Sequence, residues 1–163
     1  MNTLVNSLGR RGVQLLNCLL WRMLLHIGRY DAVPGMADRN VTLIFLSSAG
    51  KVVATAVSVA ANFEARRRGL LDREQLHPEE GLLLAPGGSI HTVGMRFGID
   101  ALFLDQHMEV LKCVHALRPW RAALAPLGTQ YVLELAAGRL VETGVARGTR
   151  LFWLECRAAG VRE

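Results

Sequence analysis

Apolar positions recur with two different spacings along the chain, and the change falls near residue 35. Within residues 4–30 the apolar side chains are three or four positions apart, which places them on one face of a helix. They are Val13, Leu16, Leu19, Leu20, Met23, Leu24 and Ile27. Pro34 and Gly35 then interrupt the helical pattern. The pattern predicts an amphipathic helical extension with its linker over residues 1–35, and a separate domain over residues 36–163.

The domain itself is expected to consist mainly of short β-strands. Apolar and β-branched runs at 41–46 and 51–59 flank a turn, so they are expected to pair as a hairpin. Further strands are predicted at residues 82–84, 90–95, 99–104, 108–116, 131–135 and 151–155.

Two short helices complete the prediction. One covers residues 63–68, with Asn62 as its N-cap and Gly69 just beyond its end, and the other lies within residues 136–143. Many short strands with few helices predict a mainly β (α+β) fold, in the form of a compact barrel-like or sandwich domain.

The run from residue 99 to residue 104 is apolar on both strand faces, except for one acid. Asp100 shares a face with Leu102 and Leu104, because strand side chains alternate. An unpaired buried charge is costly, so the Asp100 carboxylate is expected to be held by hydrogen-bond donors. The expected donors are Arg66, Arg68 and Thr92.

The 163 residues suit one domain with a modest extension. The formal net charge is +5, and residues 1–35 contribute +3 of it through four arginines against one aspartate. The excess charge therefore lies mainly in the extension, which argues against a specific nucleic-acid surface on the domain.

The cysteines and the extension bear on the cellular compartment. The three cysteines are odd in number and include no Cys-x-x-Cys pair, so reduced thiols in a cytoplasmic protein are expected. In the extension, Arg22 interrupts the apolar run, which is too short to span a membrane as an uncharged helix. Residues 4–30 are expected to lie on the domain, on a partner, or on a membrane surface.

Several short segments of the domain resemble one protein family. They are Arg66-Arg67-Arg68-Gly69-Leu70-Leu71, Gly81-Leu82-Leu83-Leu84, Ile90-His91-Thr92-Val93-Gly94-Met95, Ile99-Asp100, Phe103-Leu104-Asp105 and Val132-Leu133-Glu134-Leu135-Ala136-Ala137-Gly138. In order and spacing, residues 51–155 resemble DUF192 (UPF0127), a family of uncharacterised bacterial and archaeal proteins. The chain departs from the family pattern at Thr149, where Asp is usual, and at Gly98, where Pro is common. The resemblance implies a compact β-rich domain with short helices, and it supplies no activity.

The candidate site is a cluster of polar residues within these segments. Its members are Arg66, Arg68, His91, Thr92, Asp100 and Glu134. One interpretation is a polar site beside a pocket. The other is a structural network, in which the two acids are paired with arginine or with backbone N–H groups.

Two further patterns invite a chemical interpretation. One face of an extended segment carries His107, Cys113 and His115. Their nitrogen and sulfur atoms are suitable ligands for zinc or copper, but no fourth ligand is evident. Trp120 lies between Arg118 and Arg121 and could stack on a base or sugar, or anchor a surface loop. No metal site and no cofactor is predicted from either pattern.

These observations lead to a prediction of function with two alternatives. The domain is expected to be a non-enzymatic module that binds a small ligand or a protein partner. The first alternative is a hydrolase-like or metal-assisted enzyme that uses His91 and Asp100. The second is weak nucleic-acid binding through Arg118, Trp120 and Arg121. An open polar pocket at His91 would favour a ligand site or an enzyme, whereas a filled core would favour the structural interpretation.

Overall fold

The computed structural model describes residues 41–157. The helix expected at residues 4–30 and the linker that follows it lie outside the described residues. The strands are β1 (Val41–Ser47), β2 (Val52–Ala60), β3 (Glu80–Leu84), β4 (Ile90–His91), β5 (Ile99–Leu104), β6 (Val110–Leu117), β7 (Ala122–Ala123), β8 (Tyr131–Ala136) and β9 (Leu151–Arg157). The helices are α2 (Phe63–Arg68) and α3 (Arg139–Thr143).

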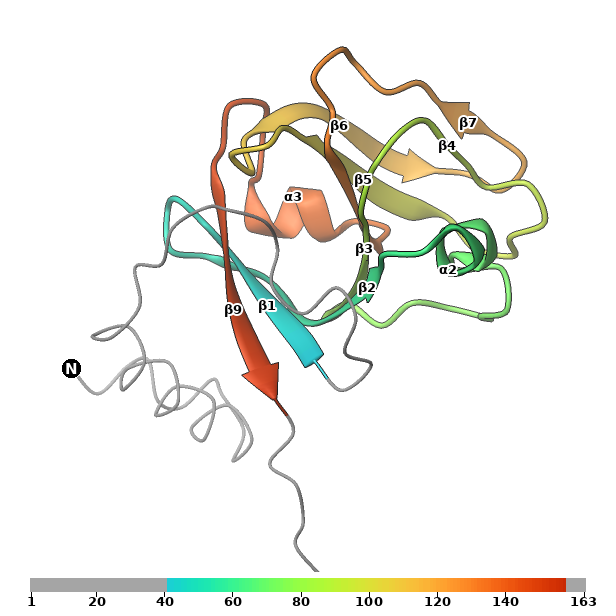
Figure 1. The fold of residues 1–163 in the computed structure, drawn as a ribbon, viewed down its shortest axis with the longest axis horizontal. Coiled ribbons are helices and arrows are strands. Elements are labelled where there is room, and N and C mark those ends of the chain that lie inside the picture. Colours follow the sequence, from blue (N-terminus) through green and yellow to red (C-terminus); the bar gives the residue numbers. More distant parts are fainter. Residues whose placement is uncertain (1–40, 158–163) are drawn as a thin grey trace, which may run out of the picture. The chain divides into compact units, whose positions relative to one another are not determined.

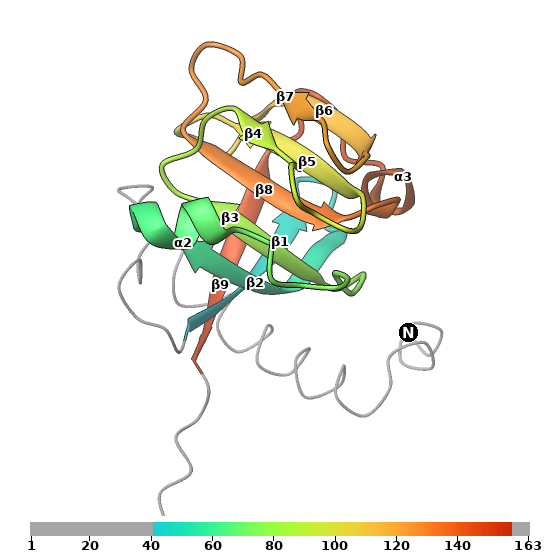
Figure 2. The same cartoon turned by 90° about the vertical axis from the view of Figure 1, so that its right-hand side faces the viewer.

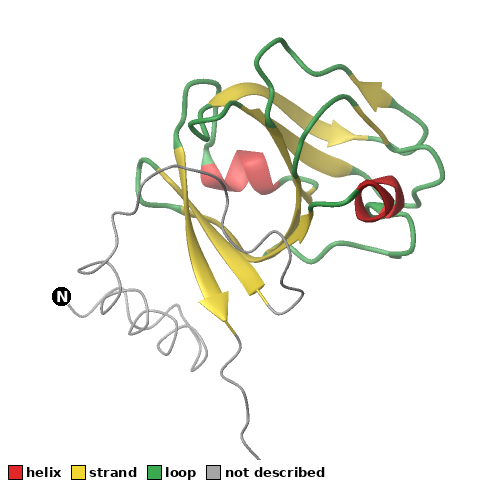
Figure 3. Cartoon of the chain, viewed as in Figure 1, coloured by secondary structure: helices red, strands yellow, loops and turns green. Residues whose placement is uncertain are grey.

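Seven strands form one curved sheet, in the order β6-β5-β8-β3-β2-β1-β9 (Figure 1). All neighbouring strands are antiparallel except β2 and β3, which are parallel. The parallel pair requires a crossover, and α2 lies in that connection. The two short strands β4 and β7 pair separately. Figure 3 shows how strongly strand predominates over helix in the described residues.

The sheet curls until the beginnings of its two end strands meet. An antiparallel bridge joins Glu109, just before β6, to Arg150, just before β9. The Leu151 N–H donates to the Met108 carbonyl at 2.9 Å, and the Val110 N–H donates to the Thr149 carbonyl at 3.0 Å. The predicted mainly β, barrel-like domain with short helices is therefore confirmed.

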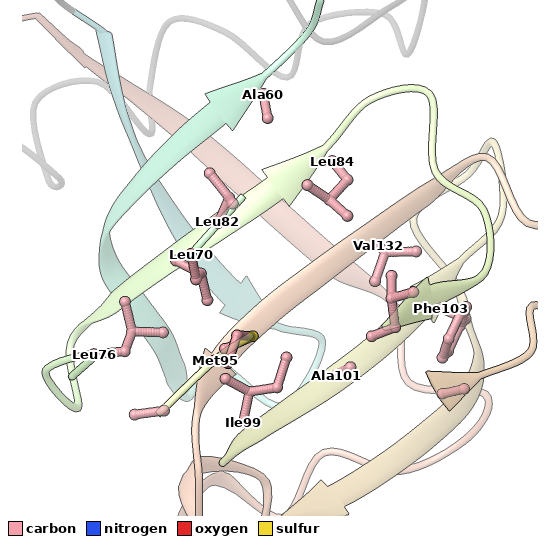
Figure 4. Packing of buried hydrophobic residues seen from close by; sticks show 13 residues of the cluster. Ala60, Leu70, Leu76, Leu82, Leu84, Met95, Ile99, Ala101, Phe103 and Val132 are labelled. Carbon is pink, nitrogen blue, oxygen red and sulfur yellow. The ribbon is translucent and has the colours of Figure 1, made fainter. Parts of the chain in front are cut away.

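The adjacent strands β5 and β8 are buried on both faces along nearly their whole length. All six β5 residues are buried, as the apolar run predicted. One face carries Ile99, Ala101 and Phe103 and belongs to a buried cluster on the α2 side, shown in Figure 4. The other face carries Asp100, whose carboxylate accepts a hydrogen bond from the N-terminus of α3. Figures 1 and 2 show α2 and α3 on opposite sides of the sheet.

Several local predictions are confirmed. The Asn62 side chain accepts a hydrogen bond from the Ala65 N–H and caps α2, which ends at Gly69. Strands β1 and β2 form the expected hairpin. The described residues contain no helix with the length and hydropathy needed to cross a membrane.

The strand expected at residues 90–95 is wrong beyond its first two residues. After His91 the chain turns, because the Met95 N–H donates to the Thr92 carbonyl and Gly94 has a φ of 86°. The apolar spacing from Ile90 to Met95 therefore reflects two separate contacts with the core and no continuous strand.

Candidate functional site

A pocket of about 460 Å³ lies between α2, the loop that leads from β3 into β4, and strand β8. Four of the six predicted site residues line it, namely Arg66, Arg68, His91 and Glu134. The other two, Thr92 and Asp100, are buried elsewhere. The structure therefore divides the predicted cluster into pocket residues and framework residues.

Glu134 is the most deeply buried polar residue on the pocket wall. It lies on β8, opposite Leu82 of β3 and Ala101 of β5, so its side chain projects from an apolar sheet face. The residue is only 6% exposed. Its carboxylate has no hydrogen-bond or ion-pair partner among the described residues.

Burial raises the pKa of Glu134 to about 7, and none of the described arginines, lysines or histidines forms an ion pair with it. The described residues contain no fully enclosed side-chain oxygen that lacks a partner. The unpaired Glu134 oxygens must therefore reach the pocket space. Glu134 is consequently a partly ionised acceptor at neutral pH, placed where a ligand can meet it.

The two arginines on the pocket wall are engaged by other groups. Nη1 of Arg66 donates to the carbonyls of Ala61 at 2.7 Å and Ala85 at 3.3 Å, and so ties α2 to the ends of β2 and β3. Arg68 is exposed and lies 3.9 Å from Glu64 and 3.6 Å from Asp72 along its own helix and turn. Neither arginine forms an ion pair with Glu134 or Asp100, among the residues that the structure describes.

His91 and Thr92 are neighbours in sequence but have different surroundings. His91 is exposed and lines the pocket. Thr92 is fully buried, and its hydroxyl donates to the Arg118 carbonyl at 2.6 Å and accepts from the Arg121 N–H at 3.0 Å. Thr92 therefore anchors the loop that carries Trp120, and its role is structural.

Asp100 is fully buried and held by donors, as predicted, but the predicted donors are wrong. Its Oδ1 accepts from the Ala116 N–H at 2.7 Å, and its Oδ2 accepts from the Leu140 N–H at 2.8 Å. Ala116 lies in a bulge where β6 has an extra residue opposite Asp100, and its φ is 45°. Leu140 is in the first turn of α3, whose N-cap Gly138 has no side chain to cap the helix. Asp100 thus satisfies two backbone groups that the local fold leaves without partners.

The adjacent residues Gly87 and Gly88 line the pocket in the loop that leads from β3 into β4. A Cβ on Gly87 would lie 2.5 Å from the backbone of Tyr131, so only glycine lets this loop lie against β8. Gly88 has open space around it and no left-handed φ. Packing therefore explains Gly87, whereas Gly88 borders the pocket without any such constraint.

Sequence reasoning missed the apolar part of the pocket. Phe63 is 75% exposed at its rim, and the buried side chains of Leu70, Leu84, Ile90 and Met95 contribute to its walls. These residues come from separate segments of the chain. In the sequence, their apolar character predicts that they are buried, but it does not indicate that they border the same pocket. Among the described residues, no three His, Cys, Asp or Glu side chains are grouped closely enough to hold a metal ion.

The family assignment follows from comparison with known proteins. The family model DUF192, described as "Uncharacterized ACR", matches residues 43–153. The match covers most of the chain, and the chain belongs to this family of uncharacterised proteins, as the sequence segments indicated.

Curated relatives extend this similarity to archaea. The chain is 32% identical over 110 residues to UPF0127 protein PF1050 of Pyrococcus furiosus, covering 64% of this chain and 91% of the relative. It is also 32% identical over 111 residues to a UPF0127 protein of Thermococcus sibiricus, covering 64% and 70% respectively.

Solved structures share the fold. A protein of unknown function from Novosphingobium aromaticivorans superposes with a TM-score of 0.62 at 20% identity, covering 75% of this chain and 91% of that one. A Sinorhizobium meliloti protein, provisionally described as a transcription regulator, superposes with a TM-score of 0.60 at 25% identity, covering 68% and 91%. The curled sheet with its short helices is therefore a recurring arrangement.

Proposed function

We propose that this DUF192 domain is a binding module, and that the pocket beside α2 takes a small ligand. One observation carries the proposal: Glu134 is buried on the pocket wall and has no hydrogen-bond or ion-pair partner within the part of the chain that the structure describes. A buried acid is normally satisfied by the fold itself, as Asp100 is. A pocket of about 460 Å³ that combines apolar side chains with a few polar groups, one of them the buried Glu134, has the size and make-up of a small-molecule site.

A blocking variant tests this proposal. Gly88→Trp adds a large side chain on the pocket wall at a position where an added Cβ would meet no other atom within 4 Å. Small molecules from a chemically diverse fragment set that bind the full-length protein, as detected by ligand-observed NMR, should lose at least about tenfold in affinity in this variant, since about 1.4 kcal/mol of contact is removed.

The matched control is Val141→Trp, which enlarges an exposed side chain of α3 outside the pocket lining. This variant should retain the affinities of the wild type. The proposal fails if no fragment binds the wild-type protein, or if binding is the same in Gly88→Trp.

The enzymatic alternative receives support from a different residue than expected. His91 lines the pocket, whereas both oxygens of Asp100 are occupied by backbone N–H groups away from it, so the two residues do not form an acid–base pair. A carboxyl group with a pKa of about 7 is suited to general acid–base chemistry, so Glu134 replaces Asp100 in this alternative. A reaction that Glu134→Gln abolishes, while ligand affinity is kept, would favour it.

The provisional description of the S. meliloti relative raises nucleic-acid binding as a further question. In the described residues α2 and α3 have six and five residues, which is short for a helix that reads a DNA groove. We therefore propose that any nucleic-acid binding is electrostatic and independent of sequence. Its affinity should fall steeply as salt concentration rises, and a sequence preference that persists at high salt would contradict this.

A further inference from the structure

The charge distribution of the pocket suggests the chemistry of its ligand. Besides Glu134, the charged and titratable side chains on the pocket wall are Arg66, Arg68 and His91. Both arginines are held by other groups, and His91 is exposed at the surface. Leu82 and Ala101, which are paired with Glu134 on the two neighbouring strands, are uncharged. Glu134 is therefore an acid on the pocket wall that forms no ion pair with any cation of the described residues.

Most of the other side chains on the wall are apolar. Leu70, Leu84, Ile90 and Met95 are each less than a tenth exposed and belong to the buried cluster in Figure 4. At the rim, Phe63 is largely exposed. A ligand with an aliphatic or aromatic body would bury these surfaces together with its own.

We propose, on the basis of the function proposed above, that this pocket selects ligands that carry a cationic amino group on an apolar body. The amino group would donate to the unpaired Glu134 carboxylate. Such a charge-assisted hydrogen bond is stronger than one between neutral groups, and the burial of Glu134 strengthens it further. An anionic head group would instead be repelled by the ionised Glu134 carboxylate, so it would bind only when that carboxyl group is protonated.

This inference has a signature in the proton balance. Free Glu134 is about half protonated near neutral pH, because burial raises its pKa to about 7. A cationic ligand stabilises the carboxylate form, so binding releases a proton and strengthens as the pH rises. An anionic ligand favours the protonated form, so its binding takes up a proton and weakens as the pH rises.

Three probes with the same six-carbon body separate these cases: hexylammonium, hexanoate and hexanol. Each is titrated into the full-length protein by calorimetry at about pH 6 and about pH 8, in two buffers with different ionisation enthalpies. Hexylammonium should bind more tightly than hexanol and hexanoate. Its affinity should rise about tenfold between the two pH values, since the ionised fraction of Glu134 rises by that factor.

Variants assign the effect to one side chain. Glu134→Gln keeps the shape of the residue and should reduce hexylammonium binding to the level of hexanol. The matched control Glu74→Gln changes an exposed acid outside the pocket lining and should leave binding unchanged. His91 also lines the pocket, so His91→Gln is a second control: if Glu134 is the source of the pH dependence of hexylammonium binding, that dependence should persist in His91→Gln.

The outcomes distinguish this inference from the function on which it rests. Tighter binding of hexanoate, or equal binding of all three probes, would overturn the amine preference while a ligand pocket stands. If fragments bind in a way that Gly88→Trp blocks but hexylammonium does not bind, the inference alone fails. If neither fragments nor probes bind, both proposals fail.

Discussion

Two buried acids occupy adjacent strands of the same sheet, yet the fold treats them differently. Asp100 on β5 pairs with Leu135 of β8, and Glu134 pairs with Ala101, so the acids are one register position apart. Paired residues project to the same side and successive residues alternate, which places the two acids on opposite faces. The Asp100 face meets α3, and the Glu134 face meets the pocket.

The difference between the acids lies in their donors. Asp100 is fully buried and accepts two short hydrogen bonds from backbone groups. Glu134 is almost as buried and accepts none from the described residues. Burial by itself therefore does not distinguish an acid that the fold supplies with donors from one that it leaves without them. We propose that an acid of the second kind is available to a ligand.

The largest expected effect is the loss of stability when Asp100 is removed. Asp100→Ala leaves the Ala116 and Leu140 N–H groups without acceptors, and each hydrogen bond to a charged group contributes about 1.5–3 kcal/mol. The free energy of unfolding, measured by chemical denaturation, should fall by about 3–6 kcal/mol in total. Asp100→Asn keeps one acceptor oxygen, so it should cost about half as much.

The control for this series is Asp72→Ala, which removes an exposed acid and should change stability by less than about 0.5 kcal/mol. Midpoints for both Asp100 variants at or above that of the wild type would show that Asp100 is not kept for the fold. The contrast with Glu134 would then disappear.

The next effect concerns Glu134 and has the opposite sign. Its pKa is about 7 in the folded protein, raised by burial from a reference of 4.5, so folding favours the protonated form. Protonation of Glu134 therefore contributes to the free energy of unfolding. This contribution is fully present below about pH 4.5 and is lost as the pH rises through about 7. At about pH 8, Glu134→Gln should be more stable than the wild type by about 3 kcal/mol.

This prediction is measured as the difference in unfolding free energy between wild type and Glu134→Gln across that pH range. Taking the difference cancels the titration of all other groups. Glu74→Gln should follow the wild type throughout. Parallel curves of unfolding free energy against pH for wild type and Glu134→Gln would mean that folding does not raise the pKa of Glu134.

A smaller effect reports the electrostatic influence of Asp100 on the nearby Cys113 thiol. Burial raises the pKa of the Cys113 thiol, and the negative charge of Asp100 raises it further. In Asp100→Asn the thiol pKa should therefore fall, as measured by the pH dependence of alkylation in a background without the other two cysteines (Cys18→Ser, Cys156→Ser).

Local unfolding could also change alkylation rates, so a second variant is needed. Leu83→Ala destabilises the core without changing any charge. It should leave the alkylation pKa of Cys113 unchanged even if the rate rises. An equal fall in both variants would remove the electrostatic explanation.

The smallest expected effect is the coupling between the two acids. They share no hydrogen-bond partner and project to opposite faces of the sheet. The stability changes of Asp100→Asn and Glu134→Gln should therefore add in the double variant, within about 0.5 kcal/mol. A larger coupling energy would show that the two sites act as one network, as in the structural interpretation of the predicted cluster.

The sequence determined the elements of the domain and its family. Local signals are sufficient for these features, because strand runs, the Asn62 cap and the turn at Gly69 depend on residues close together in the chain. The same reasoning predicted the burial of Asp100 from its position in an apolar run. It failed at Thr92, where the turn to Met95 depends on contacts with the distant loop that contains Arg118 and Arg121.

Only the tertiary structure decided which polar groups meet. The donors to Asp100 are the backbone N–H groups of Ala116 and Leu140, and a backbone N–H has no signature in a sequence because every residue except proline carries one. The pocket likewise joins α2, the loop around Gly88 and Glu134 of β8, which lie far apart in the chain. Sequence alone could name Glu134 as a candidate. The long-range packing of the sheet decided that it lies in a pocket without a partner.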